Sequence, residues 1–208
     1  AWAGGAGGRG VRMGQLQGMT GRWAIPLFRD SKLNSLFKTI KGMEAKGKEI
    51  NLIVLIHRTK TRVLSNSDMI RRDVSEYASK HDFLFYEHSD RNEPSLEDQL
   101  RLHRYVTMLV GPHGAAEVDM ISMRHNTCLV EIQRNDRTVW CYARSAMAMG
   151  MHFFSVPSIV IGQTNITVRG TGVHPKRTTR AKNLIGADME DLAKSMDMCV
   201  LKRNGGKM

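Results

Sequence analysis

The sequence has few cysteines and no long apolar run. Its three cysteines, Cys128, Cys141 and Cys199, form no C-x-x-C pair and are odd in number, so neither a zinc motif nor a disulfide framework is indicated. We expect buried thiols, because Cys128 falls in an apolar strand pattern and Cys141 in a helical one. No stretch approaches the roughly 20 apolar residues of a membrane span, and the first residues lack a signal-peptide pattern. We expect a fragment or processed piece, with any membrane anchor outside this chain.

Aromatic residues are scarce, at 6% of 208 residues, whereas Lys and Arg outnumber Asp and Glu to give a net charge of +11. The densest basic segment, residues 169–182, contains no Phe, Tyr or Trp on which a nucleic-acid base could stack. We expect a basic loop or tail there and no nucleic-acid partner. A basic nucleic-acid-binding protein stays as an alternative, because it would explain the charge.

Apolar strand patterns alternate with helical patterns through the middle of the chain. Strands are predicted at residues 51–57, 83–87, 106–110, 127–132 and 152–156, and helices from about 66, from 95 after a Ser95 cap, after 114 and over 138–149. Amphipathic or weaker helical patterns cover residues 30–46 and 188–198. This alternation predicts an α/β fold, a Rossmann-like parallel sheet with helices on both faces.

The chain divides by composition into three parts. Residues 1–29 are rich in Gly and Arg and read as a flexible tail or linker, since no strand precedes the glycines. Residues 30–160 are predicted to form the Rossmann-like domain. Residues 161–208 are predicted to be a basic C-terminal extension with one helix.

A strand, a tight turn and a helix are predicted at T-M-L-V-G-P-H-G-A-A-E, residues 107–117. Ligands of open α/β sheets bind outside the carboxyl ends of the strands, where this turn lies with Arg58 and Arg62 from the first strand. The planar guanidinium of Arg grips phosphate oxygens bidentately, and a helix start offers free N–H groups. We therefore expect a diphosphate site here. No D-x-D sequence suggests a divalent metal, so we expect no metal cofactor.

Four blocks of sequence resemble glycosyltransferase family 61 in their order and approximate spacing. They are L-I-H-R-T-K-T-R-V-L-S-N (55–66), P-S-L-E-D-Q-L-R-L (94–102), L-V-G-P-H-G-A (109–115) and L-V-E-I (129–132). The family includes the EGF-domain-specific O-linked N-acetylglucosaminyltransferase, the protein O-mannose N-acetylglucosaminyltransferase and plant β-1,2-xylosyltransferase. The resemblance covers about half of the chain.

The resemblance implies the C-terminal, donor-binding half of an inverting transferase of the two-domain GT-B type. It implies a UDP-sugar donor, UDP-GlcNAc or UDP-xylose, a protein or glycan acceptor, and the lumen of the endoplasmic reticulum or Golgi. The residues that match the family's donor site are Arg58, Arg62, Asn66, Gln99, Gly111, His113, Gly114, Ala115 and Glu131. No residue is assigned as the catalytic base. A non-catalytic module with the same fold is an alternative.

Two acidic residues depart from the family's usual G-A-G-L-T-N sequence after the histidine. Glu117 and Asp119 are expected to add negative charge near the diphosphate, which would weaken donor binding if either side chain faced the ligand. A sequon at Asn165-Ile166-Thr167 is compatible with a secreted protein.

Overall fold

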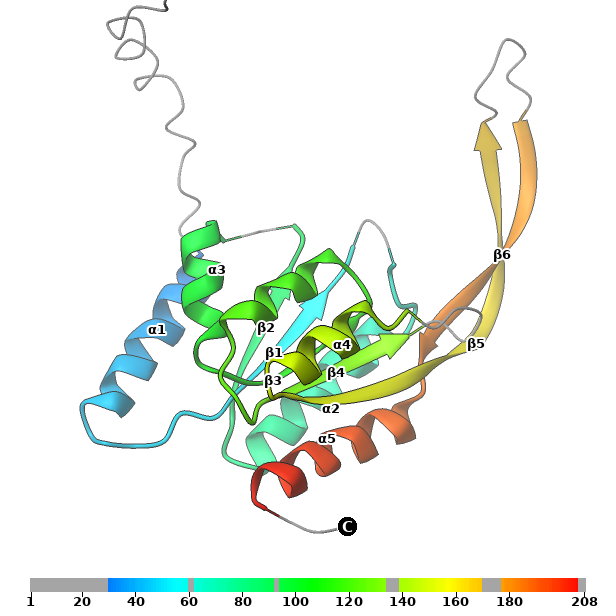
Figure 1. The fold of residues 1–208 in the computed structure, drawn as a ribbon. Helices are drawn as coiled ribbons and strands as arrows, with labels where there is room; N and C mark the ends of the chain where they lie inside the picture. The colour runs from blue at the N-terminus through cyan, green and yellow to red at the C-terminus, as the bar shows by residue number, and fades with distance from the viewer. Residues whose placement is uncertain (1–29, 60–61, 92–93, 134–138, 170–176, 206–208) are drawn as a thin grey trace, which may run out of the picture.

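The computed structural model describes residues 30–59, 62–91, 94–133, 139–169 and 177–205, except for the side chains of residues 163–185. One six-stranded sheet in the order β2-β1-β3-β4-β5-β6 runs through it (Figure 1). The strands are β1 (Leu52–His57), β2 (Leu84–Ser89), β3 (Val106–Pro112), β4 (Cys128–Gln133), β5 (His152–Arg169) and β6 (Arg177–Ala187). The first five strands pair in parallel. The predicted Rossmann-like α/β fold is therefore confirmed.

The central strands are buried on both faces, as their continuous apolar sequences predict. Every residue of β3 and β4 is buried, and so are five of the six in β1. Such strands need helices above and below them. The carboxyl ends of β1, β3 and β4 consequently meet at one covered edge, where the loops that follow them can form a site.

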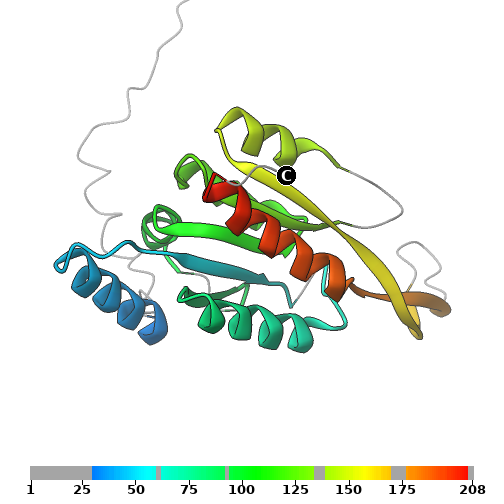
Figure 2. The same cartoon turned by 90° about the horizontal axis from the view of Figure 1, so that it is seen from below.

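Helices cover the two faces of the sheet separately (Figures 1 and 2). One face carries α1 (Ser31–Glu44), α3 (Leu96–His103), the 3-10 helix η2 (Ala115–Ser122) and α4 (Cys141–Ala148). The other carries α2 (Ser67–Lys80) and α5 (Met189–Arg203), which bury Val74 and Leu192 completely. None of the helices in the described ranges is long and apolar enough to span a membrane.

Capping side chains fix several helix starts that the sequence indicates. Ser95 accepts a hydrogen bond from the Asp98 N–H at 3.2 Å, which confirms the predicted cap of α3. Asp30 and Asp188 cap α1 and α5 in the same way. The segment after Gly114 is helical as predicted, but it is a 3-10 helix rather than an α-helix.

The segment after Pro157 differs from the prediction. β5 does not end at Val156 but continues to Arg169, and β6 returns antiparallel beside it. The two strands project from the body of the protein as a long ribbon (Figure 1). Part of the basic segment expected to be a loop or tail is therefore strand, with Arg169 opposite Arg177 in the register. The abundance of β-branched residues in T-N-I-T-V is the signal that basic composition concealed.

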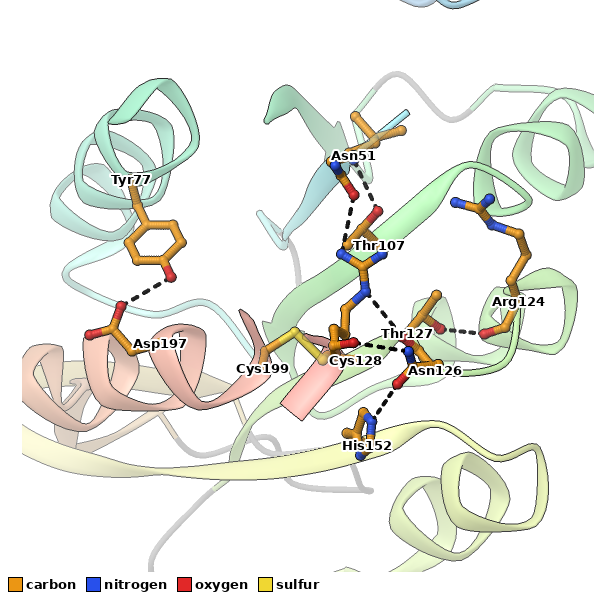
Figure 3. Close-up of a disulfide and its surroundings, with 12 residues drawn as sticks. Asn51, Tyr77, Thr107, Arg124, Asn126, Thr127, Cys128, His152, Asp197 and Cys199 are labelled. Atoms are coloured by element: carbon orange, nitrogen blue, oxygen red, sulfur yellow. Dashed lines mark hydrogen bonds between the residues drawn. A yellow bond between two sulfur atoms is a disulfide. The ribbon is translucent and has the colours of Figure 1, made fainter. Parts of the chain in front are cut away.

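The prediction of three buried thiols is wrong. Cys128 at the start of β4 and Cys199 in α5 form a disulfide across 71 residues (Figure 3), and Cys141 is an exposed free thiol. The pairing depends on α5 packing against the sheet, which no local spacing reveals. A hydrogen bond of 3.0 Å from the Tyr77 hydroxyl to Asp197 joins α5 to α2 on the same face.

Candidate functional site

The turn between β3 and η2 lies where the backbone of β3 runs close to β1. A Cβ atom on Gly111 would stand 2.7 Å from Cβ of Ile56, so glycine is required by packing at this position. The His113 N–H donates to the Ile132 carbonyl oxygen at 3.1 Å, which extends the pairing of β3 with β4 into the turn. The turn is thus held rigidly at the carboxyl edge of the sheet.

Two arginines from the loop after β1 meet at Gly114. A Cβ atom at this position would lie 3.0 Å from Nη1 of Arg62 and 3.4 Å from Nη1 of Arg58. Arg62 also donates from Nη1 to the His113 carbonyl oxygen at 2.6 Å. The predicted convergence of both arginines on the glycine-histidine turn is therefore observed. It places two guanidinium groups beside one turn of the backbone, an arrangement suited to an anion.

Arg62 has an unusual backbone conformation for its residue type, with φ at 56°. A non-glycine residue in this left-handed region costs about 1–3 kcal/mol and is commonly retained at functional sites. The conformation brings an otherwise exposed arginine back over the turn.

Asp90 orients the loop that carries the arginines. Its carboxylate lies 3.6 Å from Nε of Arg58 and accepts hydrogen bonds from the N–H and hydroxyl of Thr59 at 2.9 and 2.6 Å. The prediction from sequence did not include Asp90. Its place just after β2, at the same edge of the sheet, is the signal that could have revealed it.

His113 and Glu131 form the polar centre of the site. His113 Nδ1 is hydrogen-bonded to Oε1 of the fully buried Glu131, and Gln133 donates to the other carboxylate oxygen at 2.7 Å. The imidazole also contacts Tyr142 of α4, with 5.2 Å between ring centroids. An imidazole bound through Nδ1 keeps Nε2 for a ligand.

Glu117 lies next to this pair and bears on two expectations. These are a free N–H group at the helix start and a negative charge near the ligand. Glu117 is completely buried, and its Oε2 accepts the Gly114 N–H at 3.2 Å, so this N–H is not available to a phosphate. Burial, with the nearby charge of Glu131, raises the pKa of Glu117 to about 10. Burial therefore favours the neutral form of the Glu117 carboxyl group. Atoms of His113, Glu117 and Glu131 lie within 4.8 Å of one another, a spacing that a metal ion could also bridge.

Asp119 faces a different cluster. Its charge acts on two buried histidines, His88 of β2 and His103 of α3, whose rings are 6.4 Å apart. Burial is the main cause that lowers the pKa of His88 to about 4, and it lowers the pKa of His103 as well. Asp119 therefore acts electrostatically on these two histidines.

Two other residues of the family pattern have their own partners, and a third is exposed. The Asn66 side chain donates to the Ala187 carbonyl oxygen at 2.9 Å and accepts the Ala187 N–H at 3.0 Å, so it fastens the arginine loop to the end of β6. Gln99 donates to the Pro94 carbonyl oxygen at 2.8 Å, at the start of α3. Ala115 is an exposed residue at the start of η2.

An open hollow lies beside the turn. Arg58, His57 and Pro112 line it together with aliphatic side chains and the start of α2. His57 is hydrogen-bonded to Glu87 at 2.5 Å, at the ends of β1 and β2. The hollow places aliphatic side chains next to Arg58.

A family model described as Glycosyltransferase 61 matches residues 19–130, which is more than half of the chain. The match contains Arg58, Arg62 and the whole glycine-histidine turn, and it ends one residue before Glu131. No individual curated protein gives a significant match. The chain belongs to glycosyltransferase family 61.

Proposed function

We propose that the chain binds the diphosphate of a UDP-sugar at the Gly114 turn and serves as the donor-binding half of an inverting GT-B transferase. Family membership implies transfer of a sugar from a nucleotide-sugar donor to an acceptor. The observation that carries the proposal is the meeting of Arg58 and Arg62 at Gly114. Two guanidinium groups match the two negative phosphates of a nucleoside diphosphate.

The same arrangement supports the chemistry of transfer. In an inverting reaction the acceptor oxygen attacks the anomeric carbon while the bond to the diphosphate breaks, so negative charge develops on the leaving oxygen. Arg58 and Arg62 can stabilise that charge without a metal ion, because they are already held at the turn. His113 adds a donor at the same place once its imidazole is charged. The group that accepts the proton of the acceptor is not assigned.

Titration calorimetry with UDP tests the proposal. The Arg62→Ala variant is expected to weaken binding by at least about 1.5 kcal/mol, the low end for a charge-assisted hydrogen bond. Arg72→Ala is the matched control, because Arg72 is an exposed arginine of α2 that pairs with Asp73, away from the turn. Equal affinities of the wild type and Arg62→Ala would refute the assignment.

We also propose that the protein works in the lumen of the secretory pathway. The Cys128–Cys199 disulfide supports this location, because structural disulfides persist in oxidising compartments and are rare in the cytosol. The sequon residue Asn165 lies in β5 opposite Ala181 of β6, and its side chain is outside the described residues. When intact cells are denatured in the presence of an alkylating reagent, the protein is expected to be labelled at Cys141 alone. Labelling of all three cysteines would contradict a lumenal location.

A further inference from the structure

Glu117 is an acidic side chain placed where water cannot reach it. The residue is fully buried in η2, and only one of its two carboxyl oxygens, Oε2, receives a hydrogen bond from a described donor, the Gly114 N–H. Oε1 has no donor among the described residues. A buried carboxylate with one weak donor is unfavourable, because charge in the protein interior needs compensation. A proton on Glu117 removes that difficulty.

The neighbouring Glu131 is compensated in a way that Glu117 is not. Glu131 receives a hydrogen bond from His113 on one oxygen and from Gln133 on the other. Two adjacent carboxyl groups in an apolar surrounding cannot both be charged, and the proton resides on the group with fewer donors. Glu117 is that group, and the rise of its pKa to about 10 agrees with the geometry. Protonated, its O–H can donate to Glu131, because a carboxyl oxygen of each residue lies within 4.8 Å of the other.

We propose that Glu117 is a positioning residue of the donor site, a neutral carboxylic acid that donates its O–H to Glu131 and thereby fixes the Glu131–His113 pair beside the arginines. The effect on the donor rests on the proposed function. The ionisable groups around the pair are Arg62 from the loop after β1 and Cys141 and Tyr142 from α4. Glu117 thus supports the turn from the protein interior. The resemblance to the family instead suggests a charge at this position that opposes the ligand.

Three substitutions of Glu117 separate hydrogen bonding from packing. Glu117→Gln keeps the shape of the side chain and offers an N–H₂ donor to Glu131. Glu117→Leu fills the space but has no donor. Glu117→Ala neither fills the space nor offers a donor. We expect Ala and Leu to weaken UDP binding by about tenfold and Gln to restore it to within about twofold of the wild type. If Glu117→Leu bound UDP as tightly as Glu117→Gln, the proposal would be overturned, because packing alone would then explain the role of Glu117. Tighter binding by Gln than by the wild type would also overturn it, since Glu117 would then be a charged group that repels the ligand.

Infrared spectroscopy gives a readout that does not depend on the ligand. A protonated carboxyl group has a C=O stretch that a carboxylate lacks, so the wild type at pH 7.5 should show one such band that Glu117→Gln removes and the exposed Glu97→Gln retains. Absence of the band would overturn the proposal. Its presence without any UDP binding would leave Glu117 neutral while refuting the proposed function, so the two failures are distinguishable.

Metal binding is tested with the same variants. The three side chains could bridge an ion only with both carboxyl groups charged. We expect UDP affinity to stay the same after treatment with EDTA, and no stoichiometric binding when Zn²⁺ or Mn²⁺ is titrated into the protein. One bound ion per chain that Glu117→Gln abolishes would overturn the proposal in favour of a metal site.

Discussion

Nη1 of Arg62 donates a 2.6 Å hydrogen bond to the carbonyl oxygen of His113, 51 residues further along the chain. This bond turns an arginine of the loop after β1 onto the turn after β3. The guanidinium is held before any ligand arrives, so binding of an anion need not order it.

Substitution of Gly114 should disturb the arginines while leaving the fold intact. The new Cβ of Gly114→Ala would stand 3.0 Å from Nη1 of Arg62, at the end of a flexible side chain that can move away. We expect stability within about 0.5 kcal/mol of the wild type and UDP affinity lower by up to about tenfold. Calorimetry measures the affinity and thermal denaturation the stability.

Gly42→Ala is the control for this substitution. Gly42 is an exposed residue of α1, and an added Cβ would meet nothing within 4 Å. We expect it to stabilise the protein by roughly 0.5–1 kcal/mol, because alanine suits a helix better than glycine does, and to leave UDP affinity unchanged. A similar loss of affinity in both variants would show that the site does not depend on Gly114.

Asn66→Ala should detach the arginine loop from the end of β6. The substitution removes both hydrogen bonds to the buried backbone of Ala187. We expect a loss of about 2–4 kcal/mol in the free energy of unfolding, because two buried backbone groups lose their partner, together with weaker UDP binding. Asn34→Ala, on the exposed face of α1, should change neither property.

Gly186→Ala provides a second route to the same contact. Its Cβ would lie 2.5 Å from Oδ1 of Asn66, so it should displace the amide and reproduce the Asn66→Ala effects on both stability and affinity. Normal UDP binding in both destabilised variants would show that Asn66 supports the fold alone.

Acid should destabilise the protein through His88. The buried imidazole has a pKa lowered to about 4, mainly by burial, with the charges of His103 and Arg58 acting in the same direction and those of Asp119 and Asp30 opposing them. In the unfolded chain His88 takes up a proton below about pH 6.5, while in the folded protein it stays neutral until about pH 4. The unfolded state thus binds more protons in this window, and stability falls as pH decreases through it, by roughly 3 kcal/mol in total.

Urea denaturation between pH 7 and pH 4 measures this dependence. His88→Gln should be less sensitive to pH than the wild type, because one titrating group has been removed. His125→Gln, at an exposed position, serves as the comparison. Parallel pH profiles for the wild type and His88→Gln would exclude His88 as the source.

Loss of the disulfide should lower stability substantially. Cys199→Ser opens a loop closed across 71 residues, and a bridge of that span contributes roughly 2–5 kcal/mol. Cys141→Ser should have no such effect, since Cys141 is an exposed free thiol. Thermal denaturation with and without a reductant checks both variants, and equal melting temperatures for the wild type and Cys199→Ser would contradict the bridge.

The sequence predicts the sheet and part of the site because each of those features is determined by a short segment of the chain. Apolar runs such as L-V-G-P mark buried strands, and parallel strands must bring their carboxyl ends together. Arg58, Arg62 and His113 could therefore be placed near one another before their distances were known. The packing of β3 beside β1 then decides the details, such as the close approach of Gly111 to Ile56.

Other features depend on contacts that no short segment contains. Asn66 meets Ala187 across 121 residues, and Cys199 reaches Cys128 only because α5 packs on the sheet. The charge of Glu117 depends on burial and on Glu131, which the sequence around position 117 does not show. Composition also concealed β6, because its basic residues are typical of loops.

The order of the cysteines along the chain has a consequence for biosynthesis. A polypeptide that emerges amino end first exposes Cys141 to Cys128 well before Cys199 has been made. Under oxidising conditions the two earlier thiols can join, and such a bond has to be exchanged before Cys128 can pair with Cys199. Where the early bond forms, folding requires thiol exchange, and a serine at position 141 removes that requirement.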